Sequence, residues 1–449
     1  MSLDYETVVK KAVGKGLSDA EVYAVESTTV QFTVANDRVI ESTWRKRLDI
    51  GLRGAVGRRV GSIRVNTLEE VDSVLEKLLS ITRASQEDPY WGGFPPVYKL
   101  VAKPKTYDER TASMSEEEYV EVLKYTMDKF KEPALSKGAT KAVVTEGMFE
   151  VARAELSIVN SNGVNLREMY TEVSLWLVLS VEKNGSSSSK TLVYAKNLID
   201  EKALAEAATR EGELAMLFFN AQPVESGVYD VVLDPSVAGL VLTSSLAPAF
   251  SALNILENRS PLRNKHEQLV MSEKVTIIDD PFLEGATGTR SFDDEGVPAR
   301  AKPVVEKGVF TTILQSYYTS RRMNTKPTGN GVRQSPATQP VPGFTNFAVK
   351  PGKGKLAKFA EELEKGLVVY EVIGYWMSDP VTGSVKATVT HGLLIEKGSV
   401  VKPVKGVVLG GNVYEWLSRN LVEVGEDVYV VDNTATPSVW IREVKVAGK

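Results

Sequence analysis

The sequence contains no cysteine and only two histidines, His266 and His391. Without cysteine the chain can form no disulfide bond, no thiolate metal ligand and no cysteine nucleophile. The shortage of histidine restricts the metal sites and acid–base sites that the chain can build, so any such site must rely mainly on carboxylates, hydroxyls and amides.

Other classes of protein are disfavoured by what is missing. No segment approaches the ~20 consecutive apolar residues of a membrane span, and the first residues, MSLDYETVVKKAVGKG, lack the apolar core of a signal peptide. We therefore expect a cytoplasmic protein without a membrane partner. The net charge of −4 argues against nucleic acid as the main partner. No Gly-x-x-x-x-Gly-Lys-Ser/Thr motif is present, which excludes P-loop nucleotide chemistry.

The length of 449 residues predicts two domains. We place an N-terminal α+β domain at residues 1–220 and a β-rich C-terminal domain at residues 225–449, separated by a segment rich in Pro, Gly and polar residues. A helix, a hairpin, further strands and a helix occur twice in the first half, at an offset of about 120 residues. The predicted fold class is α+β: an N-terminal duplicated α/β sheet domain followed by a mostly antiparallel β domain with few helices.

Local signals place the elements. Asn36-Asp37 is predicted to form a hairpin turn, and Thr67–Glu70 and Ser115–Glu118 are predicted capping boxes that open helices. In the second half, the expected helices lie near Pro235–Ala252, near Lys355–Lys365 with Gly366 as a cap, and near Asn412–Arg419.

The most informative segment is VVLDPSVAGLVLTSSLAPAF at residues 231–250, in which a strand leads through Asp234-Pro235 into a helix. This segment resembles the TldD/PmbA family, whose members were once described as modulators of DNA gyrase and are now understood as peptidases. In the active TldD branch, the resemblance implies a His-Glu-x-x-x-His helix that binds zinc through two imidazoles, with the Glu as general base and a cysteine completing the site.

Laid on this chain, that motif places Thr243 at the first His, Ser244 at the Glu and Pro248 at the second His. None of the three can take over the function of the residue it replaces, and the cysteine ligand does not exist in this sequence. The chain therefore resembles the TldE/PmbA branch, which lacks the metal site. We expect no catalytic residue and no metal at these degenerate positions.

Downstream segments follow the order found in the family: Asp279-Asp280-Pro281, the acidic stretch SFDDEGVP at residues 291–298, TGNGVR at residues 328–333, Thr345-Asn346, and GGN at residues 410–412. His391 departs from the family, in which a small residue is expected before Gly392. The candidates for peptide binding are Asp294, Glu295, Asn330, Arg333 and His391.

Each candidate also has a purely structural interpretation. Asp293, Asp294 and Glu295 are a candidate site for a metal or a peptide amine, but they can also be a turn that shapes its own loop. Gly329–Gly331 can hold a substrate backbone close or be a turn that needs positive φ. Arg333 can bind a carboxylate or tie two loops together, and His391 can be an ordinary strand histidine. The basic stretch Arg45-Lys46-Arg47 beside Trp44, together with Arg53, Arg58 and Arg59, is interpreted as a solvent-facing strand edge guarded by charge.

By resemblance, the chain is a non-catalytic subunit of a TldD/TldE-type zinc metallopeptidase that degrades or processes unfolded peptides. Its partner would be a TldD-like metallopeptidase subunit, in a heterodimer or larger assembly, and the zinc cofactor is expected in that partner. Two alternatives stay open: a homodimeric peptide-binding protein without enzymatic role, and a hydrolase with an unrecognised site built on His391 and the acidic loop.

Overall fold

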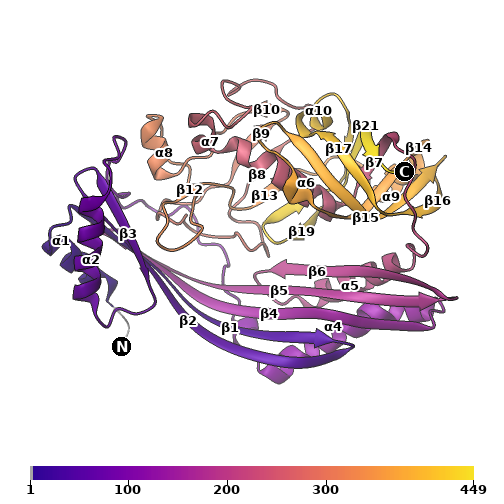
Figure 1. The fold of residues 1–449 in the computed structure, drawn as a ribbon, viewed down its shortest axis with the longest axis horizontal. Helices are drawn as coiled ribbons and strands as arrows, with labels where there is room; N and C mark the ends of the chain where they lie inside the picture. Colours follow the sequence, from indigo (N-terminus) through magenta and orange to yellow (C-terminus); the bar gives the residue numbers. More distant parts are fainter. Residues whose placement is uncertain (1–3) are drawn as a thin grey trace.

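The computed structural model describes residues 4–449. In Figure 1 the long curved strands of the first half form one sheet, and the second half lies across one face of this sheet. None of the helices in the described part of the chain is long and apolar enough to cross a membrane. The architecture is mixed α+β with few helices, as the sequence predicts.

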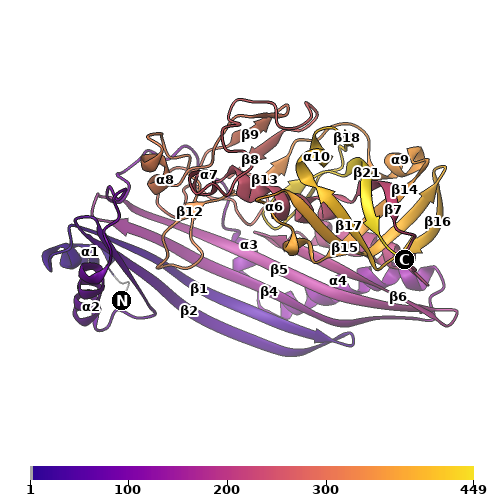
Figure 2. The same cartoon turned by 45° about the horizontal axis from the view of Figure 1, so that its top comes forward.

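The first half is built on a six-stranded antiparallel sheet of order β3-β2-β1-β4-β5-β6. Its strands are β1 (Asp19–Ala35), β2 (Arg38–Val56), β3 (Arg59–Val65), β4 (Lys141–Asn160), β5 (Asn165–Lys183) and β6 (Ser186–Lys196). Because β1 pairs with β4 at the centre, the two sets of three consecutive strands extend outward in opposite directions from this pairing. The second half of the chain lies over this sheet (Figure 2).

One face of the sheet carries the four longer of the five helices that the described residues of the first half form. The helices are α1 (Tyr5–Gly14), α2 (Val71–Ala84), α3 (Glu109–Ser113), α4 (Glu116–Ser136) and α5 (Glu201–Ala215). On β1, Val22 and Ala24 belong to the core with α1 and α2, whereas Phe32 and Val34 belong to the core with α4 and α5. Alternation along the strand then turns Glu21 and Tyr23 to the opposite face, toward the second half.

Two local predictions are confirmed and one is wrong. Asn36 and Asp37 have φ values of 49° and 62°, as a type I′ hairpin turn requires, and Ser115 and Glu118 form a reciprocal capping box. The capping box predicted at Thr67–Glu70 does not form, because α2 begins only at Val71. Thr67 instead accepts a hydrogen bond from the Glu69 amide within a turn that buries Leu68.

The second half contains a closed ring of strands, which we call the barrel. β14, β7, β21, β17 and β15 pair in this order, and β15 also pairs with β14. A second sheet has the order β10-β9-β8-β13-β20-β19, and β11 pairs with β12. All pairings in this half are antiparallel except β14 with β7 and β13 with β20.

The strands of the second half are β7 (Gly227–Leu233), β8 (Ile277–Asp279), β9 (Lys302–Glu306), β10 (Val309–Phe310), β11 (Gly331–Val332), β12 (Val341–Pro342), β13 (Phe347–Val349), β14 (Lys365–Ile373), β15 (Ser384–Glu396), β16 (Ser399–Val404), β17 (Val407–Asn412), β18 (Leu421–Val424), β19 (Tyr429–Val431), β20 (Thr434–Thr436) and β21 (Val439–Ala447). The helices are α6 (Pro235–Leu246), the 3₁₀ helix η1 (Ala247–Phe250), α7 (Ala252–Leu256), α8 (Tyr317–Arg322), α9 (Leu356–Glu362), the 3₁₀ helix η2 (Tyr375–Met377) and α10 (Val413–Leu417).

Two helix predictions in this half need correction, and one helix is not predicted. The helix expected over Pro235–Ala252 ends at Leu246 and gives way to η1, which contains Pro248. Gly366 is not a helix cap, because it lies in β14, where a Cβ atom would come within 2.4 Å of the Asp230 carbonyl oxygen. The six-residue helix α8 is not predicted at all, since it is too short to show a periodic apolar pattern.

Candidate functional site

Helix α6 carries Thr243 and Ser244, two of the three positions that the resemblance places at the metal motif, and the third, Pro248, lies in η1. Asp234 caps the helix by accepting a hydrogen bond from the Ser236 amide at 3.0 Å. Thr243 donates its hydroxyl to the Gly239 carbonyl at 2.7 Å, and Ser244 donates to the Val241 carbonyl at 3.1 Å. Both hydroxyls are therefore used by the helix backbone, and Pro248 lies beyond the end of the helix.

The residues at these positions do not fit a zinc ion. Zinc sites in proteins use three or four N, S or O ligands, whereas Thr243 and Ser244 offer only weakly binding hydroxyls and Pro248 offers no ligand atom. Across residues 4–449, no group of three or more His, Cys, Asp or Glu side chains is placed to hold a metal ion. The Nε2 atom of His266 contacts the Thr311 carbonyl oxygen at 2.9 Å.

Asp293 shapes the acidic loop from inside. One carboxylate oxygen accepts hydrogen bonds from the amides of Glu295 and Val297, each at 2.9 Å, and the other accepts from the Gly331 amide at 2.8 Å. Burial raises the pKa of the Asp293 carboxyl to about 7, while the three amide donors act in the opposite direction. The loop is thereby fastened to β11.

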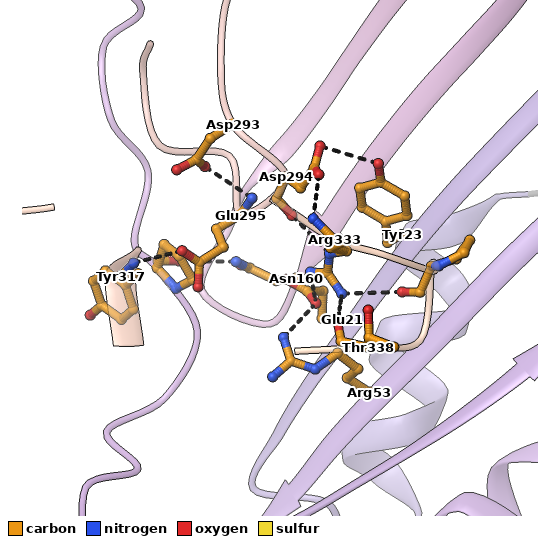
Figure 3. Close-up of polar contacts among 12 residues, drawn as sticks. Glu21, Tyr23, Arg53, Asn160, Asp293, Asp294, Glu295, Tyr317, Arg333 and Thr338 are labelled. Atoms are coloured by element: carbon orange, nitrogen blue, oxygen red, sulfur yellow. Dashed lines mark hydrogen bonds and ion pairs between the residues drawn. The ribbon is translucent and has the colours of Figure 1, made fainter. Parts of the chain in front are cut away.

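Asp294 connects this loop to the sheet of the first half. Its carboxylate accepts hydrogen bonds from the Tyr23 hydroxyl at 3.2 Å and from the Arg333 amide at 2.7 Å (Figure 3). It also pairs with Arg290 at 3.2 Å. The Arg333 guanidinium lies 4.6 Å from the Tyr23 ring centre, within the range of a cation–π contact. The acidic loop, through Asp294, and the segment after β11, through Arg333, thus both contact the Tyr23 side chain of β1.

Glu295 is a buried carboxyl at the start of α8. It accepts a hydrogen bond from the Tyr317 amide at 2.6 Å, and a Cβ atom on Gly331 would come within 2.5 Å of its Oε2 atom. Burial, followed by the charge of Asp293, raises the pKa of Glu295 to about 8. Glu295 is therefore protonated over much of the neutral pH range.

Glu21 is the anchor of this network on the sheet. Its Oε1 atom accepts from Arg333 at 2.5 Å and from Arg53 at 3.3 Å, and all three side chains are buried. The Arg53 guanidinium lies 5.9 Å from the Trp91 ring centre and 5.3 Å from that of Phe94. The second oxygen of Glu21, Oε2, is buried and has no hydrogen-bond partner among the described residues.

Sequence reasoning missed Glu21 and Tyr23, and its interpretation of Arg53 as part of a solvent-facing strand edge is wrong, because Arg53 is buried. A signal exists, because Glu21 and Arg53 lie inside otherwise apolar strand segments, DAEVYAV and DIGLRGAV. Lone charges in such segments are unusual unless they are paired. The second partner of Glu21 is Arg333, 312 residues away, and no local pattern identifies it.

Asn330 belongs to a neighbouring cluster around Asp279. Its amide nitrogen donates to Asp279 and to the Gly343 carbonyl, both at 2.8 Å, and its oxygen accepts from Thr328 at 2.7 Å. Asp279 also pairs with Lys302 at 2.5 Å. The Asn330 side chain is fully buried, and its amide is committed to holding loops together.

His391 lies apart from the other four candidates. Its Nε2 atom contacts the Ser189 carbonyl oxygen at 2.8 Å, and its Nδ1 atom lies 3.4 Å from Glu371. Glu371 also accepts from the buried Lys190 at 2.5 Å. Burial disfavours the Glu371 carboxylate, but His391 and Lys190 outweigh this effect and lower its pKa to about 2. This is a second ionic junction between the two halves of the chain.

The five candidates therefore have known partners but no demonstrated ligand. Asp294, Glu295 and Arg333 come together, Asn330 lies beside them, and His391 belongs to the second junction. Arg333 does tie loops together, through the carbonyls of Pro336 and Thr338. The role of these residues in peptide binding stays a prediction.

Comparison with known proteins identifies relatives along the chain. Residues 226–448 match the family described as PmbA/TldA metallopeptidase C-terminal domain, and residues 20–82 match PmbA/TldA metallopeptidase domain 1. A metalloprotease of Methanothermobacter thermautotrophicus is 32% identical over 276 residues, which cover 60% of each protein. An uncharacterised protein of Methanocaldococcus jannaschii is 28% identical over 420 residues, covering 92% of this chain and 93% of the relative. The first of these matches thus spans less than two thirds of its relative.

Solved structures share the fold at low sequence identity. TldE of Thermococcus kodakarensis superposes with a TM-score of 0.90 at 24% identity, covering 99% of this chain and 100% of that one. A Thermotoga maritima protein described as a modulator of a DNA gyrase gives a TM-score of 0.86 at 22% identity, with 99% of each chain covered. With the domain matches and the metalloprotease relatives, these findings show that the chain belongs to the TldD/PmbA family of metallopeptidase-like proteins.

Proposed function

We propose that this chain is an accessory subunit without a catalytic zinc of its own, which acts with a TldD-like metalloprotease on unfolded peptides. The observation that carries the proposal is that α6 offers no metal ligands at the positions of the metal motif. Thr243 and Ser244 use their hydroxyls within the helix, and the helix ends before Pro248. Several similar proteins are described as metalloproteases, and a family member that cannot hold the metal is suited to a supporting role beside one that can.

A free strand edge supports the peptide part of the proposal. β2 pairs with β3 along Ile50–Val56, and within residues 4–449 no strand pairs with residues 38–49 on that side, so these residues present unpaired backbone groups. An extended peptide can add to such an edge through main-chain hydrogen bonds, which demand little sequence preference. Ile40 and Trp44 on this edge are 61% and 57% exposed and offer apolar contacts.

Three of the basic side chains near this edge are already paired. Arg45 contacts Glu150 at 3.5 Å, Lys46 contacts Glu26 at 2.7 Å, and Arg47 contacts Asp49 at 3.0 Å. Their charge is largely balanced, so a nucleic-acid backbone finds little unpaired positive charge here. We therefore favour a peptide over a nucleic acid as the ligand of this edge.

The test uses the purified chain and the family member with an intact His-Glu-x-x-x-His motif that is encoded in the same genome. We expect no stoichiometric zinc in this chain by elemental analysis, no cleavage of an unstructured peptide by this chain alone, and faster cleavage by the mixture than by the metalloprotease alone. Stoichiometric zinc that survives mild chelation contradicts the proposal. Cleavage by the chain alone that is lost on His391→Ala identifies the hydrolase alternative instead.

A further inference from the structure

One outer surface of the barrel is apolar and uncovered. Paired residues of β14, β15, β17 and β21 form a first row across it: Ile373, Thr388, Val408 and Ala447. A second row, two residues along, crosses β15, β17, β21 and β7: Lys386, Gly410, Lys445 and Val228. We call these two rows the barrel face. Figure 1 shows no helix in front of β15 and β17.

Strand alternation confirms which way these residues point. Ala387, Val389 and Leu409 lie one position away from the rows and are buried in the barrel core. Their neighbours on the barrel face are accessible, with exposed fractions of 50% for Ile373, 37% for Val408 and 62% for Val228. Antiparallel sheets that face water normally place polar residues at such positions. Here most of them are apolar or small.

The turn η2 extends the apolar surface at one end. Ser378, just after η2, is hydrogen-bonded to the backbone of Lys386, which fixes the turn beside the barrel face. Trp376 and Met377 in this turn are 66% and 65% exposed. Aromatic residues and methionine are enriched at protein–protein interfaces. Tyr375 of the same turn packs into the core that contains α6, so the surface borders the helix with the degenerate motif.

The charges on the barrel face discriminate between two occupants. Both charged residues of the two rows are lysines, Lys386 and Lys445. The nearby carboxylate of Asp379 is held by its own turn, through Thr382 at 2.7 Å and the Val381 amide at 2.9 Å. A symmetric contact with a second copy would bring the lysines of both copies into one interface, where like charges are unfavourable.

We infer that the barrel face, with Trp376 and Met377, is the docking surface for the TldD-like subunit, and that the partner meets it with apolar side chains and carboxylates opposite Lys386 and Lys445. This inference rests on the proposed function, because it takes its partner from there. Docking here covers an apolar surface that water otherwise contacts and places the partner next to α6.

The absence of cysteine makes a direct test simple. Val408→Cys introduces a single thiol on the barrel face, and Val97→Cys introduces a matched thiol on an exposed position of the first half. The rate of reaction with a thiol reagent is measured for each variant, free and with the His-Glu-x-x-x-His family member in excess. We expect at least about tenfold slower labelling of Val408→Cys in the complex and an unchanged rate for Val97→Cys. Ile373→Cys replaces Val408→Cys if the latter does not fold.

Charge reversal supplies a second measurement. Lys386→Glu with Lys445→Glu is expected to weaken association at least about tenfold, whereas the matched change Lys202→Glu on α5 leaves it unaltered.

If the unaltered chain forms no complex by light scattering, the proposed function and this occupant both fail. If the complex forms but Val408→Cys keeps its free labelling rate, the docking surface is wrong and the accessory function stands. A homodimer that protects Val408→Cys without the partner also overturns the assignment.

Discussion

Arg333 and Glu21 form a buried ion pair with 2.5 Å between the guanidinium nitrogen and the carboxylate oxygen, although 312 residues separate them in the chain. Glu21 projects from β1, and Arg333 follows β11 in the second half. Arg53 of the same sheet also donates to Glu21, and Arg333 donates in addition to the carbonyls of Asp294, Pro336 and Thr338 in its own half. Separating the two halves would leave the buried Arg333 guanidinium without a carboxylate partner. The ion pair therefore stabilises the packing of the two halves against each other.

Gly51→Ala is expected to disturb this junction without changing any charge. A Cβ atom on Gly51 would lie 2.0 Å from the Pro336 carbonyl oxygen, which is also the acceptor of Arg333. The loop must therefore move, and the expected loss in the free energy of unfolding is about 1–3 kcal/mol, measured by urea denaturation. Gly14→Ala is the matched control, because no atom lies within 4 Å of its added Cβ. Equal stability of the two variants contradicts the prediction.

Much of the fold is predictable from the sequence because local rules decide it. The hairpin at Asn36-Asp37 and the capping box at Ser115–Glu118 need only nearby residues, and both form as predicted. The barrel is different, because it closes when β15 pairs with β14 as well as with β17. Such pairings depend on register between distant segments, which one sequence does not reveal.

The candidate site also contains residues that the sequence predicts and residues that it does not. The acidic loop and the segment around Arg333 can be picked out by resemblance, and the structure brings Asp294 and Arg333 together. Their partner Glu21 cannot be inferred, since strand periodicity shows only which face a residue occupies and not what lies across from it. His391 is separated from the loop because β15 carries it to the junction with Lys190.

Stability is expected to fall as the pH rises from about 5 to 8, and Glu295→Gln should flatten this decline. Burial raises the pKa of Glu295 from 4.5 to about 8 in the folded chain. Between these values the folded state binds more protons than the unfolded state, so deprotonation destabilises the fold. One proton of difference corresponds to about 1.4 kcal/mol per pH unit.

The measurement is the free energy of unfolding in urea at several pH values from about 5 to 8.5, a range that spans the titration of Glu295 in the folded chain. Glutamine cannot ionise, so the free energy of unfolding of Glu295→Gln should fall less steeply with pH than that of the unaltered chain. Glu273→Gln, at an exposed glutamate, is the matched control and should leave the slope unchanged. Parallel slopes for all three proteins would show that Glu295 does not carry the effect.

The second junction predicts a large effect of Lys190→Met. Lys190 is buried and contacts Glu211 at 3.1 Å and Glu371 at 2.5 Å, on α5 and β14. Removing the ammonium leaves two carboxylates short of a partner, so we expect a loss of about 3 kcal/mol in the free energy of unfolding. Lys202→Met removes an exposed pair with Glu206 and should change stability within experimental error. A Lys190→Met chain as stable as this control would mean that the junction contributes little.

Restoring the metal motif on α6 is expected to fail. The triple variant Thr243→His, Ser244→Glu and Pro248→His supplies two imidazoles and a base, but α6 ends at Leu246 and the second imidazole would start from the 3₁₀ turn η1. No third ligand follows, because the chain has no cysteine and no suitable acidic or histidine cluster is found among residues 4–449. Groups that orient metal ligands are missing as well, and these are worth about 10–100-fold in affinity or activity.

Zinc content and cleavage of an unstructured peptide by the variant alone are the measurements. Stoichiometric zinc with turnover that a chelator stops would show that the surroundings of a working site persist around α6, and that the three substitutions alone account for its loss. A variant that is silent alone, yet still accelerates cleavage when mixed with the His-Glu-x-x-x-His family member, is the outcome that an accessory subunit requires.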